Sequence, residues 1–196
     1  MSTKHEELAM TSSKSYMGFW IYLMTDCILF AALFATYSVL RGNVYGGPSG
    51  LEIFDLNLVL VETLLLLTSS FTCGLAIVAA RAGHKKYALY GLLLTFVLGI
   101  GFLLLEFSEF AKLVNEGYSW THSAFLSSFF TLVGTHGLHI TVGLLWLAVL
   151  AIYVTKKGLT TTAIKRLTLF SLFWHFLDVI WIFIFTIVYL FGVIPV

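Results

Sequence analysis

Eight acidic and histidine side chains lie inside long apolar stretches, where such residues could exchange protons or bind a metal ion. They are Asp26, Glu62, Glu106, Glu109, His136, His139, His175 and Asp178. A carboxylate at the centre of a lipid bilayer costs at least about 2.5–3.5 kcal/mol on an insertion scale. The same stretches contain no Lys or Arg. Each acid must therefore hold a proton, pair with a histidine, contact water, or meet a group of another subunit.

The spacing of these residues predicts where they lie. Three pairs are spaced three positions apart, which puts both members on one face of a helix: they are Glu106 with Glu109, His136 with His139, and His175 with Asp178. At about 1.5 Å per residue, the eight positions fall mainly into two polar layers. The first layer, roughly 12–17 Å from the surface on the N-terminal side, contains Asp26, His175 and Asp178. The second layer, at about 27 Å, contains Glu62, Glu106 and His136, and His139 lies between the layers.

Metal binding is the weaker interpretation of these residues. Di-metal helical bundles carry Glu-x-x-His motifs on single helices, and this sequence contains no Glu-x-x-His. The pair His136 and His139 offers two ligands, with no third ligand at a matching depth. We therefore expect no catalytic, cofactor-binding or metal site in this chain. The simplest expectation for each histidine is an interhelical hydrogen bond, and proton handling by the acids is the alternative.

The elements that must position these side chains are five apolar runs. The chain has 196 residues, of which 59% are hydrophobic and 11% charged, and this is too little polar surface for a soluble globule. Each run exceeds the roughly 20 helical residues that cross a bilayer; the runs are residues 17–40, 56–80, 88–111, 124–154 and 167–194. The sequence predicts an all-α integral membrane protein. One five-helix domain, residues 17–194, follows a polar segment, residues 1–16.

The distribution of charge predicts the orientation of the chain. Nine of the eleven Lys and Arg residues fall on the side of the N-terminus and of the second and fourth loops. Because basic loops stay in the cytoplasm, we expect a cytoplasmic N-terminus and a C-terminus outside. Aromatic residues near the span ends, including Tyr37 and Tyr189 on the outer side, are expected at the membrane surfaces. The net charge of +1 and the absence of long basic runs exclude a nucleic-acid-binding protein.

Motifs in four of the five runs resemble subunit III of the haem–copper oxidases. The motifs are Phe19-Trp20-Ile21-Tyr22-Leu23-Met24-Thr25-Asp26 with Leu29-Phe30, Glu106 and Glu109 after Leu103-Leu104-Leu105, Gly134-Thr135-His136-Gly137-Leu138-His139, and Trp174-His175-Phe176-Leu177-Asp178-Val179-Ile180-Trp181. The resemblance extends from Met17 to about Gly192. Family members that oxidise cytochrome c have seven helices, and this chain corresponds to the last five, as in the quinol-oxidising members.

The resemblance implies a subunit without a redox cofactor. In the family, subunit I carries the haems and copper, and subunit III binds beside it, holds phospholipid and supports stability and proton uptake. The partners implied are subunits I, II and IV, in a bacterial inner membrane with the C-terminus in the periplasm. Asp26 matches the buried acid of the family's corresponding helix. The shared polar positions are matched by Glu106, Glu109, His136, His139, His175 and Asp178; Glu62 matches no motif and inherits no role.

Two other functions are compatible with the buried polar residues. A free-standing proton or ion transporter could use the two layers as relay stations, and an independent redox protein could bind haem or metal. Against the transporter stand the odd number of predicted helices, the absence of Pro inside the helices, and the lack of paired short spans that would indicate an inverted repeat.

Overall fold

A computed structural model describes residues 2–44, 53–118 and 120–193, with the backbone alone for residues 2–13. In these residues the regular elements are helices: α1 (Ser2–Leu40), α3 (Leu56–Arg81), α4 (Lys85–Asn115), α5 (Ala124–Lys157) and α6 (Thr161–Ile184). The last helix continues into a π-helical segment, η1 (Phe185–Leu190). Five helical stretches in the described chain are long and apolar enough to cross a membrane. The predicted fold class is confirmed.

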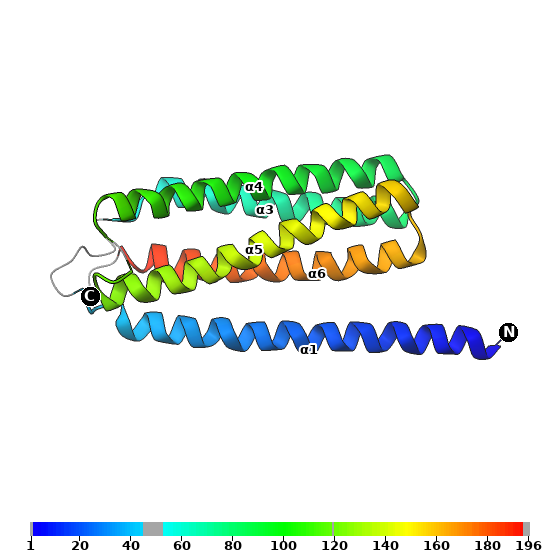
Figure 1. Cartoon of the computed structure of the whole chain (residues 1–196), viewed down its shortest axis with the longest axis horizontal. Coiled ribbons are helices and arrows are strands. Elements are labelled where there is room, and N and C mark those ends of the chain that lie inside the picture. The colour runs from blue at the N-terminus through cyan, green and yellow to red at the C-terminus, as the bar shows by residue number, and fades with distance from the viewer. Residues whose placement is uncertain (1, 45–52, 119, 194–196) are drawn as a thin grey trace.

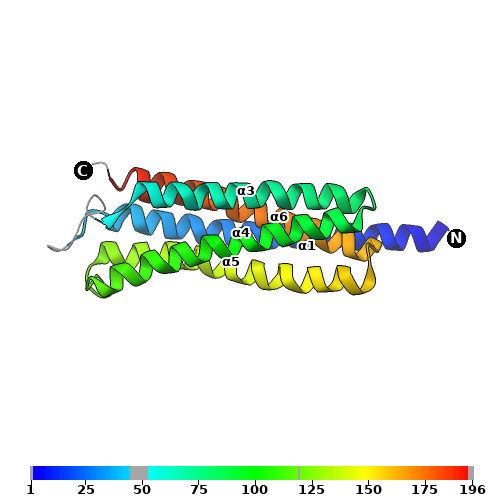
Figure 2. The same ribbon diagram turned by 90° about the horizontal axis from the view of Figure 1, so that it is seen from above.

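The helices lie side by side along the long axis of the molecule (Figures 1 and 2). The most extensive contact is between α3 and α4, while α5 packs on α4 and α6, and α6 packs on α3. Helix α1 lies at one edge of the bundle, where it contacts mainly α5 and, less extensively, α6 (Figure 1). The core therefore lies between α3, α4, α5 and α6, and α1 packs against one side of this four-helix core.

Polar caps set the starts of three helices. The side chain of Asp55 accepts hydrogen bonds from the first turn of α3, Ser123 accepts one from Leu126 N of α5, and Thr160 accepts one from Ala163 N of α6. Such caps satisfy backbone N–H groups that have no partner inside the helix. Helix α6 therefore begins at Thr161, six residues before the apolar run at residue 167. Apolar runs underestimate helix length because the backbone continues helical through polar residues until a cap ends it.

Helices α4 and α5 also extend past the predicted apolar runs. Helix α4 covers Lys85–Asn115, and α5 continues to Lys157, where Gly158 follows with a φ of 75°. A positive φ of this size favours glycine, which has no Cβ to clash with the backbone. The predicted end of the last run at residue 194 lies outside the described residues.

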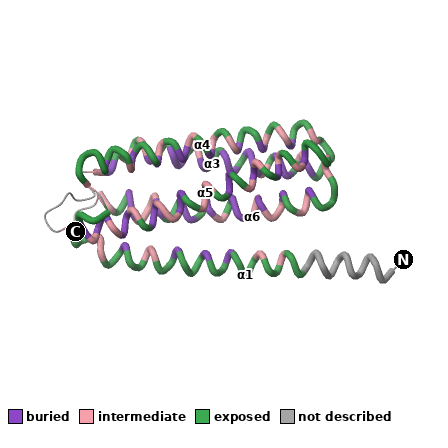
Figure 3. Tube along the Cα trace, viewed as in Figure 1, coloured by how far each residue is buried: buried purple, intermediate pink, exposed green. Residues whose placement is uncertain are grey.

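Burial differs strongly between the helices. On α1, the buried side chains follow a single stripe, Leu23, Asp26, Phe30 and Tyr37, and most other described side chains of this helix are exposed (Figure 3). The exposed faces of α1 and α4 are largely apolar. Such faces are suited to contact lipid or other membrane helices rather than water.

Candidate functional site: buried acids and histidines between the helices

Three carboxyl groups meet inside the bundle and form what we call the acid cluster: Glu62 of α3, Glu106 and Glu109 of α4, together with Tyr189 of η1. Their exposed fractions are 0% for Glu62, 3% for Glu106 and 6% for Glu109. The Tyr189 hydroxyl donates a hydrogen bond of 3.0 Å to Glu109 Oε2. Neither oxygen of Glu62 or Glu106 has a hydrogen-bond partner in the described chain. The three acids are close enough to interact electrostatically.

The acid cluster includes one residue that matched no sequence motif. Glu62 inherits no role from the resemblance, yet α3 places it close enough to Glu106 and Glu109 to interact with them electrostatically. The pair itself was predicted to share a face of its helix, and both members are buried in the cluster. The signal for Glu62 in the sequence was its presence in an apolar run without a basic residue.

Tyr37 and Tyr189, two tyrosines expected near the outer membrane surface, have side chains that are fully buried inside the bundle. Tyr37 of α1 donates a 3.3 Å hydrogen bond to the carbonyl oxygen of Val188. Tyr189 reaches Glu109 because η1 is π-helical, which alters the direction of side chains relative to a regular α-helix. Inside a bilayer a tyrosine hydroxyl needs a hydrogen-bond partner, and the bundle provides one for each residue.

His136 is enclosed by aromatic rings. It is 0% exposed, and its ring centroid lies 5.3 Å from that of Trp181, 6.0 Å from Phe102 and 6.3 Å from Phe30. Neither of its ring nitrogens has a hydrogen-bond partner in the described residues. The expected interhelical hydrogen bond is therefore not found for this histidine, whose contacts are with rings of α1, α4 and α6.

The other two histidines of the spans bind carbonyl groups of their own helices. His139 Nδ1 lies 2.7 Å from the Thr135 carbonyl oxygen, and His175 Nδ1 lies 2.8 Å from the Ser171 carbonyl oxygen. These bonds are within one helix, whereas the sequence led us to expect hydrogen bonds between helices. The carbonyl four residues earlier is within reach on any helix, and this local partner competes with more distant ones.

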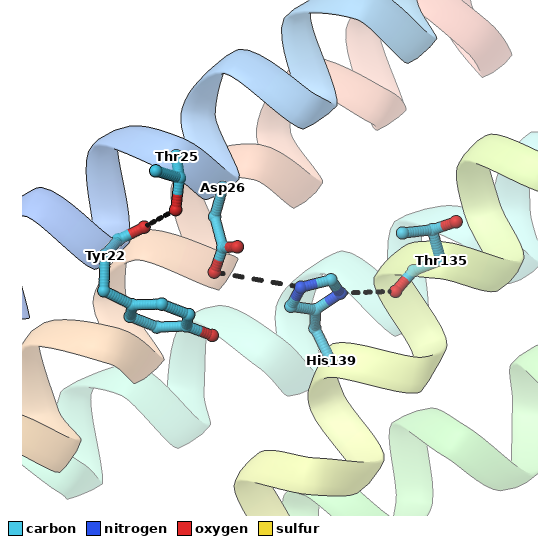
Figure 4. A network of polar contacts seen from close by, with 5 residues as sticks. All are labelled: Tyr22, Thr25, Asp26, Thr135 and His139. Carbon is cyan, nitrogen blue, oxygen red and sulfur yellow. Dashed lines mark hydrogen bonds and ion pairs between the residues drawn. The ribbon is translucent and has the colours of Figure 1, made fainter.

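Asp26 and His139 join α1 to α5 (Figure 4). The distance from His139 Nε2 to Asp26 Oδ2 is 3.8 Å. A carbonyl oxygen can only accept, so Nδ1 of His139 is the donor to Thr135 and Nε2 is left to face Asp26. Tyr22, one turn earlier on α1, places its hydroxyl near the same carboxyl group (Figure 4). Pairing with a histidine was one of the arrangements open to the acids.

Asp178 and His175 lie on α6 with different surroundings. Asp178 is buried with Ser70 of α3 nearby, whereas His175 is exposed on the outside of the bundle. No hydrogen bond or ion pair connects Asp26 with either residue in the described part of the chain. Asp26 therefore faces α5 and Asp178 faces α3, although the sequence predicts a similar depth for the two residues.

Hydrogen bonds from tryptophan hold α6 to α3. Trp174 Nε1 donates to Ser69 Oγ at 3.0 Å, and Trp181 Nε1 donates to Thr63 Oγ1 at 3.0 Å. The sequence did not single out Ser69 and Thr63, although their small polar side chains in an apolar run are typical of contacts between membrane helices. These bonds fix the rotation of α3 and α6 and so help to place Glu62 in the interior.

The arrangement is suited to holding protons. Across residues 2–44, 53–118 and 120–193, no group of three or more His, Cys, Asp or Glu side chains is placed to hold a metal ion. Carboxyl and imidazole groups without fixed cationic partners can take up and share protons. Proton handling by these side chains is part of the function proposed below.

Comparisons with known proteins find similarity to one protein family over most of the chain. Residues 2–193 match the family described as cytochrome c oxidase subunit III. The chain is 56% identical to cytochrome bo(3) ubiquinol oxidase subunit 3 of Pseudomonas putida, over 90% of this chain and 86% of that protein. It is 46% identical to quinol oxidase subunit 3 of Bacillus subtilis (strain 168), over 93% and 89%. It is also 46% identical to cytochrome c oxidase subunit 3 of Bacillus sp. (strain PS3), over 91% and 86%.

Proposed function

Because this chain belongs to the cytochrome c oxidase subunit III family, we propose that it is subunit 3 of a bacterial terminal ubiquinol oxidase of the cytochrome bo type. The complex oxidises ubiquinol, reduces oxygen to water and pumps protons. This chain is its non-redox subunit, and the haems and copper are held by subunit I. The observation that carries the proposal is the identity of 56% to a ubiquinol oxidase subunit 3 over 90% of the chain.

The structure supports a role beside a catalytic partner. The exposed apolar faces of α1 and α4 offer surfaces for lipid and other subunits. We assign subunit I as the direct neighbour, with subunits II and IV in the same complex. The chain lies in the inner membrane with its N-terminus in the cytoplasm and its C-terminus in the periplasm, as the distribution of basic residues predicts.

The subunit contributes assembly, stability, lipid binding and proton uptake to subunit I. An outer groove of about 380 Å³ between α1 and α6, lined by Trp20, Met24, Leu172, His175 and Phe176, offers room for phospholipid acyl chains. The acid cluster and the pair Asp26 and His139 provide protonatable groups inside the membrane. No relative named above is a free-standing transporter, and nothing in the comparisons supports that alternative.

Purification in mild detergent tests this function. An affinity tag on this chain should bring down a complex that shows haem absorption and consumes oxygen with ubiquinol. After separation from its partners, the chain should show no haem absorption. Proton transport by this chain alone in vesicles, or a haem that stays with the separated chain, would contradict the proposal.

The electron donor needs its own measurement. The relatives include both quinol oxidase subunits and a cytochrome c oxidase subunit at similar identity. Oxygen consumption by the purified complex should therefore be measured with reduced ubiquinol and with reduced cytochrome c as donors. We expect turnover with ubiquinol and none with cytochrome c, and the opposite result would reassign the complex within the family.

A further inference from the structure

A groove in the exposed surface between α4 and α5 ends on one member of the acid cluster. This α4–α5 groove has a volume of about 310 Å³ and is lined by Phe107 and Phe110 of α4, by Gly134, Leu138 and Thr141 of α5, and by Glu106. Its rim is apolar and open to the membrane, since Phe107 is 60% exposed and Leu138 is 63% exposed. The groove therefore connects the lipid-facing surface with a buried carboxyl group.

Glu106 is the polar group at the bottom of this groove. The residue is 3% exposed, and neither of its carboxyl oxygens has a hydrogen-bond partner within the described residues. A Cβ atom added to Gly137 of α5 would lie 2.7 Å from Glu106 Oε1. The carboxyl group therefore rests against bare backbone of α5, where only glycine leaves room for it.

A buried carboxyl group without a hydrogen bond is costly in any protonation state. Leaving a polar group unpaired in apolar surroundings is unfavourable, because the group has lost its hydrogen bonds to water without gaining new ones. Water and cationic side chains are scarce inside a bilayer. The groove gives access to Glu106 from outside the chain, so the missing partner can come from a neighbouring molecule.

The side of the groove formed by α5 consists largely of small residues. Gly134, Gly137 and Thr141 replace the larger side chains that would fill this face, and Thr141 Oγ1 donates to the Gly137 carbonyl oxygen at 2.8 Å. Small residues on a membrane helix let the backbone of another helix approach closely. Gly137 leaves room for the Glu106 carboxyl group, whereas Gly134 has no such contact and leaves space for a molecule from outside the chain.

Resting on the function proposed above, we propose that the α4–α5 groove receives a transmembrane helix of another oxidase subunit. A side chain of that helix with an amide or hydroxyl group forms the hydrogen bond that Glu106 lacks. An amide matches a carboxyl group well because it both donates and accepts. The partner is therefore defined by two properties: a helical backbone that approaches Gly134, and a polar side chain at the depth of Glu106.

Other occupants fit the groove less well. A lipid acyl chain fills apolar space but has no group that can hydrogen bond to Glu106. A metal ion would find no second acidic, histidine or cysteine ligand among the lining residues. A second copy of this chain in the groove would be recognised by a crosslinked adduct with twice the mass of the chain.

Photo-crosslinking in the purified complex tests the proposal. A benzoylphenylalanine placed at Leu138 should form an adduct with another subunit of the oxidase, and mass mapping should locate it in a transmembrane helix. Phe71 of α3 provides a matched control, because it is 66% exposed and lies about as far from the start of its helix as Leu138. A lipid adduct alone, a dimer of this chain, or no adduct at Leu138 would overturn the proposal.

Two substitutions of Glu106 test the hydrogen bond. Glu106→Gln retains hydrogen-bonding groups of similar size, and the crosslink yield at Leu138 should be maintained. Glu106→Met removes these groups but keeps an unbranched side chain, and the yield should fall about threefold or more, as expected for the loss of an interhelical hydrogen bond. Equal yields in the two variants would contradict the hydrogen bond.

Filling the groove provides a test that does not alter Glu106. A Cβ atom at Gly134 would lie 3.8 Å from Phe110, which is ordinary contact, so Gly134→Leu can extend into the groove without a clash at Cβ. This variant should abolish the crosslink at Leu138, and an unchanged yield would overturn the proposal. If the tagged chain carries no haem-containing partner at all, the proposed function fails; if it does but Leu138 contacts lipid, only this inference fails.

Discussion

The Oδ2 atom of Asp26 on α1 lies 3.8 Å from the Nε2 atom of His139 on α5. This contact lies in the narrow buried stripe that attaches α1 to the rest of the bundle. The contact joins residues separated by two helices in the sequence. It therefore offers a direct measure of how strongly a polar pair holds α1 in place.

A double-mutant cycle should detect coupling between these two residues. We expect Asp26→Asn and His139→Gln to be coupled by about 0.6 kcal/mol in the free energy of unfolding, the average for polar contacts between membrane helices. The measurement is SDS titration of the purified complex, followed through this subunit. The matched pair Asp26→Asn and His175→Gln, between which the described residues show no hydrogen bond or ion pair, should be additive within about 0.5 kcal/mol. Equal coupling in the two cycles would argue against a specific contact.

Removal of the Ser69 hydroxyl should weaken the contact between α3 and α6. In Ser69→Ala the indole N–H of Trp174 loses its acceptor, and we expect a loss of about 0.6–1.7 kcal/mol in stability. Thr68→Ala is the control, because the Thr68 hydroxyl donates to a carbonyl of its own helix, Leu64 O at 2.7 Å, and the residue is exposed. The hydrogen bond of Trp174 would be irrelevant to stability if both variants had the same unfolding midpoint.

The close contact between α3 and α4 at Gly91 should not tolerate an added methyl group. A Cβ atom at Gly91 would lie 2.8 Å from Ala76 Cβ and 3.2 Å from the Thr72 carbonyl oxygen. Gly91→Ala should therefore push the two helices apart and cost about 1–3 kcal/mol. Gly101→Ala on the same helix, where the nearest atom would be 3.9 Å away, should have little effect. Thermal stability of the complex distinguishes the two variants, and an equal change would contradict the close packing.

Vibrational spectroscopy should detect the hydrogen bond from Tyr189 to Glu109. Tyr189→Phe removes the donor at 3.0 Å, so the infrared band of Glu109 should shift, whether the group is a carboxyl or a carboxylate. The band can be assigned by its loss in Glu109→Gln. Tyr37→Phe serves as the control, because the Tyr37 hydroxyl donates to a backbone carbonyl. A Glu109 band that is unchanged in Tyr189→Phe would show that this bond is absent in the complex.

The sequence by itself determined the number and type of the helices. A run of some 20 apolar residues in a bilayer must satisfy its backbone hydrogen bonds internally, and a helix does this within one segment. Helical periodicity also placed Glu106 and Glu109 on one face, where the structure has them both buried. The family was recognisable as well, because four motifs of side chains lie in order along the chain, and the match over residues 2–193 confirms it.

Only the tertiary structure decided which helix each polar side chain meets. Periodicity fixes the direction of a side chain on its own helix, whereas its partner depends on the rotation and distance of the neighbouring helices. The distance between α3 and α4 is set by their close approach at Gly91. The rotation of α3 relative to α6 is set by the tryptophan hydrogen bonds to Ser69 and Thr63. They bring Glu62 to the acid cluster, and the π-helical turn turns Tyr189 inward to Glu109. Such contacts depend on all helices at once, so no single run of residues encodes them.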